Sequence, residues 1–307
     1  MRFLFFLFSL ILLVSENSSY IAAQSVDQLH QAAELGNVEA QWKLGVAYAN
    51  GHGVEENDEE ALKWFQLAAE QGLANAQYSL GGAYYNGKGV QKNDQEALKW
   101  FQLAAEQGHA HAQGSLGFMY YNGEGTPQNY QEAMKWWKLT AEQGHARAQK
   151  NLGVMYENGH GVPENYQEAI KWYRRAAEQG DTTAQRNLGN MYDNGKGVPR
   201  NEQEAMRWYE LIAEQGDPSD RYSLGMEYMN KRQFPNDGDD YNHCSDCNYF
   251  NVRAYAWLSV AAMEGHQLAF AQKTSLRDSF MTSSQITEAQ NLSIEIFNRI
   301  LSANNNP

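Results

Sequence analysis

Apolar residues recur along the chain at helical spacing, in pairs of segments joined by a glycine-rich stretch. In AQKNLGVMYE (residues 148–157), the alanine, leucine, methionine and tyrosine fall on one side of a helix. In YQEAIKWYRRAAEQ (residues 166–179), the first alanine, the tryptophan, the second tyrosine and the next alanine do the same. Between them lies NGHGVPEN, where glycine tolerates a positive φ, Pro163 blocks helical continuation and Asn165 is placed to cap the next helix. The pattern predicts a helical hairpin.

The hairpin pattern repeats every 36 residues. Each unit begins at one of the glycines Gly36, Gly72, Gly108, Gly144, Gly180 and Gly216. Five complete units cover residues 36–215, and residues 24–35 are expected to form a lone second helix that caps the start. Stacked hairpins of fixed period are typical of solenoids. We therefore expect an all-α fold, a right-handed α-solenoid of helix-turn-helix repeats.

Two residue types recur at fixed places in the hairpin and predict its packing. A glycine stands in the middle of each first helix, where it costs about 1 kcal/mol relative to alanine: Gly45, Gly81, Gly117, Gly153, Gly189 and Gly225. Its recurrence predicts that a neighbouring helix crosses there. A tryptophan recurs on each second helix: Trp64, Trp100, Trp136, Trp172 and Trp208. We expect these tryptophans to fill space between hairpins rather than to form a ligand cage.

The shared pattern AQ..LG..Y.NG.GV..N..EA..W...AAEQG resembles the Sel-one-like repeats, a subgroup of the tetratricopeptide-like α-solenoids. The 36-residue period and the two-glycine loop favour this subgroup over repeats of 34 residues. The resemblance covers most of the chain. It implies the fold strongly and the function weakly, because one fold hosts many functions.

The sixth unit, residues 216–265, departs from the pattern through an insert at residues 231–251. The insert holds both cysteines of the chain, Cys244 and Cys247. A disulfide between them suits an exported protein. A metal site formed with His243 and a reactive or unpaired thiol pair are the alternatives, although only one C-x-x-C pair is present.

Residues 266–307 are expected to form C-terminal capping helices and a tail. A capping box, Thr282 to Gln285, predicts the start of the last helix. This ending resembles that of bacterial members of the family, which favours a bacterial source.

The N-terminal residues predict export. Arg2 is followed by a twelve-residue apolar run and then by small residues at Ala22 and Ala23. The run is too short to span a bilayer, which takes about 20 apolar residues. We expect residues 1–23 to be a cleaved signal peptide, with a periplasmic or secreted mature protein and no stable membrane insertion.

Charge and motifs narrow the function further. The formal net charge of −13 argues against a nucleic-acid partner, because phosphate binding depends on Lys and Arg. The sequence contains no nucleophile elbow, no H-E-x-x-H and no phosphate loop. We expect a protein that is not an enzyme and binds no cofactor. The alternative is a cell-wall enzyme or accessory directed at peptidoglycan or β-lactams, although S-x-x-K is missing.

The predicted working surface is the concave face lined by the first helices. By resemblance to tetratricopeptide geometry, three positions per unit face it, and those that vary between units are free for recognition. In the first three units they include Trp42, Tyr78, Tyr85, Phe118 and Tyr121; in the next two Lys150, Glu157, Arg186, Asn190 and Asp193; in the sixth Tyr222, Met226 and Met229.

Exposed aromatic side chains are typical anchors for a protein or peptide segment. A glycan would stack on the same side chains and stays open as a ligand. The sequence thus favours an exported, non-enzymatic scaffold, in envelope regulation or host interaction, that binds a protein through this face.

Overall fold

The computed structural model describes residues 26–233 and 247–305, and within these ranges it contains helices, turns and loops but no strand. A helix over residues 26–34 comes first. The five regular hairpins follow as α2 (Val38–Asn50) and α3 (Asp58–Glu70), α4 (Ala74–Asn86) and α5 (Asp94–Glu106), α6 (Ala110–Asn122) and α7 (Tyr130–Glu142), α8 (Ala146–Asn158) and α9 (Tyr166–Ala177), α10 (Thr182–Asn194) and α11 (Glu202–Gln215). The C-terminal helices are α12 (Pro218–Gln233), α13 (Cys247–Met263), α14 (Gln267–Phe280) and α15 (Ser283–Asn305).

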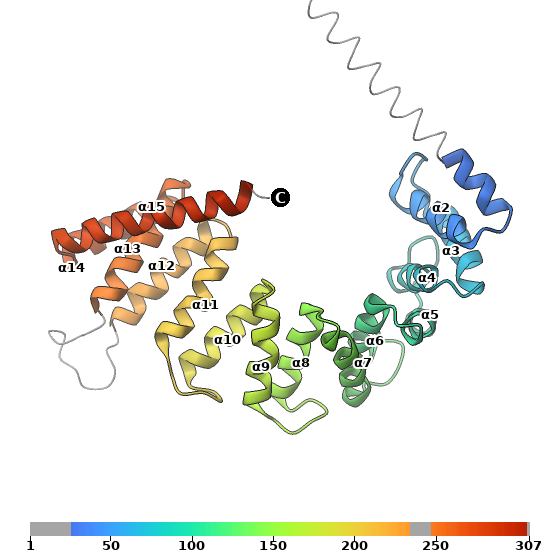
Figure 1. Ribbon diagram of the computed structural model, residues 1–307, viewed down its shortest axis with the longest axis horizontal. Helices are drawn as coiled ribbons and strands as arrows, with labels where there is room; N and C mark the ends of the chain where they lie inside the picture. The colour runs from blue at the N-terminus through green and yellow to red at the C-terminus, as the bar shows by residue number, and fades with distance from the viewer. Residues whose placement is uncertain (1–25, 234–246, 306–307) are drawn as a thin grey trace, which may run out of the picture. The chain divides into compact units, whose positions relative to one another are not determined.

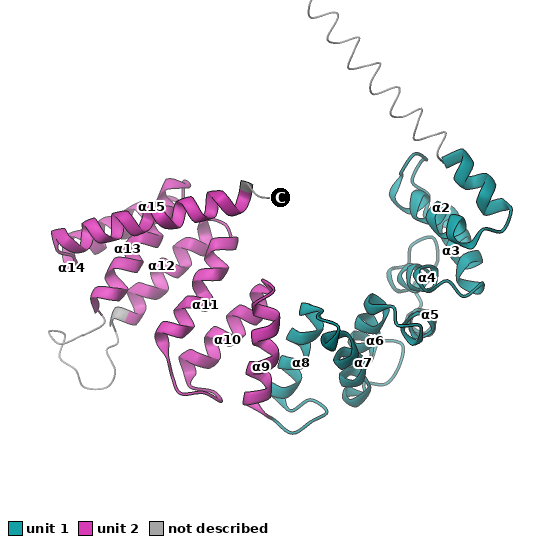
Figure 2. Cartoon of the chain, in the orientation of Figure 1, with its two compact units in different colours: residues 1–164 teal, residues 165–307 magenta. Residues whose placement is uncertain are grey.

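The chain divides into two compact units, residues 1–164 and residues 165–307 (Figure 2). Within the first unit each helix from α2 to α8 packs on the next (Figure 1). In the second unit α9, α10 and α11 pack in the same order, and α15 lies across α13 and also contacts α11. The predicted all-α solenoid is confirmed.

The hairpin turn is built as the sequence predicts. Asn165 precedes α9, and its Oδ1 accepts the backbone N–H of Glu168 at 3.0 Å. Gly159, the first glycine of the loop, has a φ of 68° and ends α8 in the left-handed conformation that suits glycine. The equivalent asparagine and glycine act in the same way in the other four hairpins.

The second glycine of the loop lies against the backbone of the preceding repeat, a contact that the sequence pattern did not predict. Gly89 lies in the loop of the second repeat, yet a Cβ there would be 2.2 Å from the backbone oxygen of Asp58, in the first turn of α3. Gly125 approaches the backbone of Asp94 in the same way, at 2.3 Å. This glycine therefore lets each loop pack on the second helix of the preceding repeat.

The glycine in the middle of the first helix makes room for an aromatic ring at Gly45, Gly81, Gly117 and Gly189, and for the side chain of Leu258 at Gly225. A Cβ on Gly81 would be 2.6 Å from Cδ1 of Phe101, and one on Gly117 would be 2.2 Å from Nε1 of Trp137. The predicted helix crossing is confirmed. The ring belongs to the residue after the recurrent tryptophan, whose own side chain packs elsewhere: Trp136 contacts the core formed around Leu116.

A buried glutamine joins successive repeats. Gln77, at the start of α4, donates from Nε2 to the backbone oxygen of Ala69 at the end of α3, at 3.3 Å. Its Oε1 accepts a hydrogen bond from Nε2 of Gln107, the residue that follows α5, at 2.7 Å. The first of these bonds recurs at Gln41, Gln113, Gln149 and Gln185. The "AQ" of the sequence pattern is thus a contact between hairpins.

The C-terminal part of the second unit forms one apolar core. Trp257 and Tyr228 are fully buried in it, and Oε1 of Glu210 accepts from both side chains and from Arg253. The predicted capping box is confirmed, because Thr282 N–H donates to Oε1 of Gln285 at 2.7 Å and Gln285 N–H to Oγ1 of Thr282 at 3.3 Å.

Helices extend into both ends of the predicted insert. The chain is helical up to Gln233, and α13 begins at Cys247, so both helices reach into the insert expected at residues 231–251. His243 and Cys244 lie outside the described residues. The disulfide with Cys247 and the alternative metal site therefore remain predictions, as does the signal peptide.

Candidate functional site

A cavity in the first unit lies on the first helices of three successive repeats, α4, α6 and α8. It has a volume of about 580 Å³. Three predicted groove residues line it: Tyr78, Tyr85 and Phe118. Phe118 is 40% exposed, an unusual state for a phenylalanine on a helix that packs on both sides. We call this cavity the aromatic groove.

Histidines gather at one end of the aromatic groove. The ring of Tyr78 stacks on His109 with centroids 4.7 Å apart, and His111 lies 5.9 Å from both rings. His145, from the next repeat, is 6.3 Å from His111. Burial, and then the proximity of His111, lower the pKa of His109, so its neutral ring can accept the Ala112 N–H at Nδ1 (3.1 Å).

Tyr85 is held at the other end of the aromatic groove by the following repeat. Its hydroxyl donates to Oε2 of Glu124 at 2.8 Å, and Lys92 lies 5.2 Å from its ring centroid. Burial, together with the hydrogen bond to Glu124, raises the pKa of Tyr85 to about 12. The side chain is therefore neutral at physiological pH and fixed in direction.

Tyr121, like Tyr85, is hydrogen-bonded by a loop residue of the following repeat, but it does not line the groove. Its hydroxyl lies 2.8 Å from Nδ1 of His160, whose ring stacks on Tyr130 at 4.6 Å. Burial, and then Tyr130, raise the pKa of Tyr121. Trp137, which the sequence analysis did not select, lines the groove and donates from Nε1 to the backbone oxygen of Gly114 at 3.1 Å.

Three other predicted groove residues of the first unit lie outside this cavity. Trp42 is half-buried against the core of the first repeats and donates to Oγ of Ser79 at 3.1 Å. Lys150 and Glu157 are half-buried on α8. Their neighbours Arg147 and Asn151 line the groove instead.

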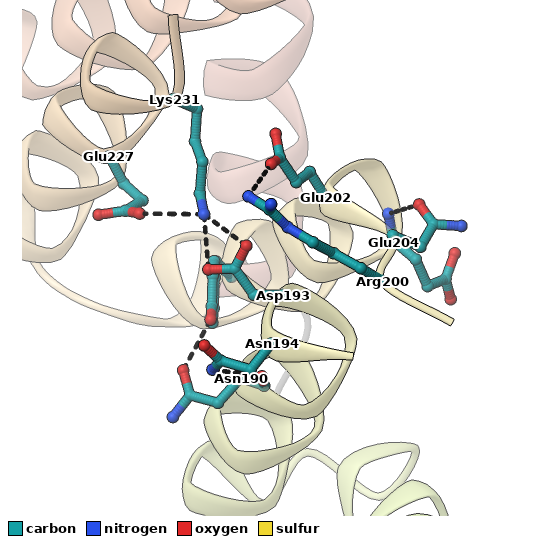
Figure 3. Close-up of polar contacts among 10 residues, drawn as sticks. Asn190, Asp193, Asn194, Arg200, Glu202, Glu204, Glu227 and Lys231 are labelled. Carbon is teal, nitrogen blue, oxygen red and sulfur yellow. Dashed lines mark hydrogen bonds and ion pairs between the residues drawn. The ribbon is translucent and has the colours of Figure 1, made fainter. Parts of the chain in front are cut away.

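The predicted residues of the fifth repeat line a separate cavity of about 300 Å³ in the second unit: Arg186, Asn190 and Asp193. Lys231 bonds Asp193 and also faces Glu227 (Figure 3). Its Nζ lies 2.6 Å from Oδ2 of Asp193 and 3.9 Å from Oε1 of Glu227. Oδ1 of Asn190 accepts the Tyr209 hydroxyl at 2.7 Å. The lining of this cavity also includes the apolar Ile212 and Leu224, and its acids Asp193 and Glu227 both lie within ion-pair distance of Lys231.

The sixth unit does not offer the predicted apolar surface. Tyr222 stacks on His266 with centroids 4.2 Å apart, and Met226 packs against the C-terminal core. Met229 is buried within that core, at 8% exposure, so its selection as a groove residue was wrong. The irregular second helix, α13, packs closely on α12 and covers this position.

Two features of the site escaped the sequence analysis. One is that His109, His111 and His145, which come from two successive repeats, lie together. The other is that the variable residue of the NGxG loop bonds a tyrosine of the preceding repeat. Glu124 bonds Tyr85 and His160 bonds Tyr121, 39 residues earlier in each case. The signal available was that spacing, which pairs a tyrosine with a polar loop residue.

Within the described parts of the chain, no three His, Cys, Asp or Glu side chains are placed to hold a metal ion. No helix among the described residues combines the length and apolar character needed to cross a membrane.

These features define a class of helical repeat proteins that present a side-chain-lined surface along stacked hairpins. Comparison with known proteins identifies the family: the Sel1 repeat matches residues 38–73, 74–109, 110–145, 146–181, 182–217 and 251–266. The chain belongs to the Sel1 repeat family. A search of curated proteins gave no match.

Two solved structures illustrate the similarity. A Sel1 repeat protein from Oxalobacter formigenes is 33% identical, with a TM-score of 0.63, over 78% of this chain and 94% of that one. A protective antigen present in uropathogenic Escherichia coli strains, which displays an SLR fold, is 26% identical, with a TM-score of 0.50, over 91% of this chain and 80% of that one. Sel1 repeat proteins are generally protein-interaction scaffolds.

Proposed function

We propose that this protein is an exported, non-enzymatic scaffold that binds a segment of a partner protein in the aromatic groove. The observation that carries the proposal is the exposed ring of Phe118 within a cavity lined by Tyr78, Tyr85 and Trp137. Large aromatic side chains at the centre of an interface supply much of its binding energy. Membership of a family of interaction scaffolds supports the same function.

Export is supported by the apolar N-terminal run, and the description of the Escherichia coli relative as a protective antigen fits a protein outside the cytoplasm. N-terminal sequencing of protein recovered from extracytoplasmic fractions should begin after Ala23. Protein that is found only in the cytoplasm with its first residues intact would contradict export.

Binding is tested by capturing partners from the envelope fraction of the source cells. Phe118→Asp places a charge in the groove and should abolish capture of a partner that the unchanged protein retains. Leu103→Asp is the matched control, because Leu103 is similarly exposed (38%) but lies on α5, outside the groove. Both variants are first compared with the unchanged protein by circular dichroism and thermal unfolding.

If Leu103→Asp loses the partner and Phe118→Asp keeps it, binding occurs on the second helices and the groove proposal fails. The absence of catalysis is tested separately with peptidoglycan and a chromogenic β-lactam. Turnover by purified protein above that of a heat-denatured sample would contradict the scaffold function.

A further inference from the structure

The lining of the aromatic groove differs in charge from the rest of the molecule. The chain carries a formal net charge of −13, with 37 acidic residues against 24 Lys and Arg. The groove lining nevertheless includes no Asp or Glu, whereas Arg147, His111 and His145 all belong to it. The distribution leaves a site that favours negative charge within an acidic protein.

Arg147 is available to a ligand. Its side chain is exposed at the start of α8, and no described carboxylate lies within ion-pair distance of it. By contrast, the acid nearest the other end of the groove, Glu124, already accepts the Tyr85 hydroxyl. A guanidinium without an internal partner can form paired hydrogen bonds with an incoming carboxylate.

The neighbouring residues suit the same ligand. The ring nitrogens of His111 and His145 can donate to a carboxylate oxygen. Phe118 and Tyr78 provide an apolar surface beside these donors, and the buried Trp137 completes the lining. A ligand that matches both the donors and the apolar surface carries a carboxylate close to a large apolar group.

We propose that the groove recognises a protein segment in which Asp or Glu lies next to an aromatic or large aliphatic residue. Arg147 pairs with the carboxylate and Phe118 packs on the apolar side chain. The inference rests on the proposed function and specifies the chemistry of the partner. A neutral glycan would use the aromatic rings and could accept hydrogen bonds from Arg147, but it would form no ion pair, so the charge favours the acidic segment.

The test is selection from a random peptide display library against three purified proteins: the unchanged chain, Arg147→Gln and Lys138→Gln. Lys138 is the matched control because it is an exposed cation on α7 that does not line the groove. Peptides enriched by the unchanged chain should contain Asp or Glu within two positions of an aromatic or large aliphatic residue. Their affinity, measured by fluorescence anisotropy, should fall about two- to fivefold in Arg147→Gln and stay unchanged in Lys138→Gln.

A second variant, at Phe118, distinguishes the preference for acidic peptides from peptide binding in the groove as such. Phe118→Ala should weaken the same peptides about tenfold or more, whereas Leu103→Ala should not. This inference is overturned if the enriched peptides lack Asp and Glu, or if they need Phe118 but bind Arg147→Gln as well as the unchanged chain. Either result leaves the scaffold function unaffected. Failure to enrich any peptide, or binding unaffected by Phe118→Ala, overturns both. Binding of chitin oligosaccharides that is indifferent to Arg147 assigns the groove to glycans.

Discussion

Gly81 and Gly82 are adjacent in α4 but meet different surroundings. A Cβ on Gly81 would be 2.6 Å from the ring of Phe101, whereas one on Gly82 would meet nothing within 4 Å. Gly81→Ala should therefore destabilise the protein by about 1–3 kcal/mol through overpacking. Gly82→Ala should stabilise it by about 0.5–1 kcal/mol because alanine favours the helix.

Thermal and urea unfolding of the two variants measure these effects. The opposite signs make the comparison its own control, since both changes add one methyl group to the same helix. Equal stabilisation by both substitutions would mean that the Phe101 ring moves aside readily and that the glycine is not needed for packing.

His109 makes stability depend on pH. Its pKa is lowered from the ordinary 6.5 by burial and then by His111, so the unfolded chain binds the proton more strongly than the folded one. Stability is therefore fully present above about pH 6.5 and is lost as the pH falls through the lower, folded value. His109→Asn should reduce this loss, because Asn37 caps α2 from the same position without titrating.

The measurement is the melting temperature between about pH 7.5 and pH 5.5. The slope is compared rather than the absolute value, since His109→Asn also removes the stacking on Tyr78. His52→Asn, at an exposed loop position, is the control and should leave the slope unchanged. An unaltered slope in His109→Asn would show that other groups cause the acid sensitivity.

At the scale of elements, Glu210 joins α11 to α12 and α13. Its Oε1 accepts from Tyr228, Arg253 and Trp257, and its side chain is 15% exposed. Glu210→Gln removes the charge that balances a largely buried Arg253, so we expect a loss of about 2–4 kcal/mol. Glu214→Gln, on the same helix, breaks only the exposed pair with Arg299 and should cost less than about 1 kcal/mol.

Unfolding in urea distinguishes the two variants. A similar small loss in both would mean that the amide introduced by Glu210→Gln keeps the hydrogen bonds of Tyr228 and Trp257 and that the charge contributes little.

The sequence predicted those elements whose causes are local. Asn165 and Pro163 act within the hairpin that contains them, so the turn, the helix ends and the 36-residue period could be predicted directly. Contacts between hairpins could not be predicted in this way. The bond from Tyr85 to Glu124 and the pairing of Asp193 with Lys231 join residues 38 or 39 positions apart, and they depend on how the helices are stacked.

The candidate site was predicted in part for the same reason. Tyr78, Tyr85 and Phe118 were selected because their positions vary between repeats, and they line the groove. Trp137 was missed because it lies on a second helix and reaches the groove only through the space left by Gly117. Met229 was misplaced because the inserted repeat packs its helices differently from the regular ones.

At the scale of the whole molecule, apolar packing is local along the regular repeats and shared among the C-terminal helices. In the first unit the cores around Phe65 and Phe101 each join neighbouring hairpins. In the second unit the helices from α11 to α15 share one core, which runs from Met206 to Ile300. Repeat arrays transmit stability mainly between neighbours, so a local change should have a local effect.

Hydrogen exchange followed by mass spectrometry tests this locality with the variants already described. Gly81→Ala should speed exchange in α4 and α5 and in the helices next to them, and leave α13 and α15 unchanged. Glu210→Gln should speed exchange in α11, α12, α13 and α15 together, because these helices share one core, and leave α4 and α5 unchanged. Faster exchange throughout the chain in either variant would instead show that the molecule opens as one cooperative unit, and that stability is not divided along the array.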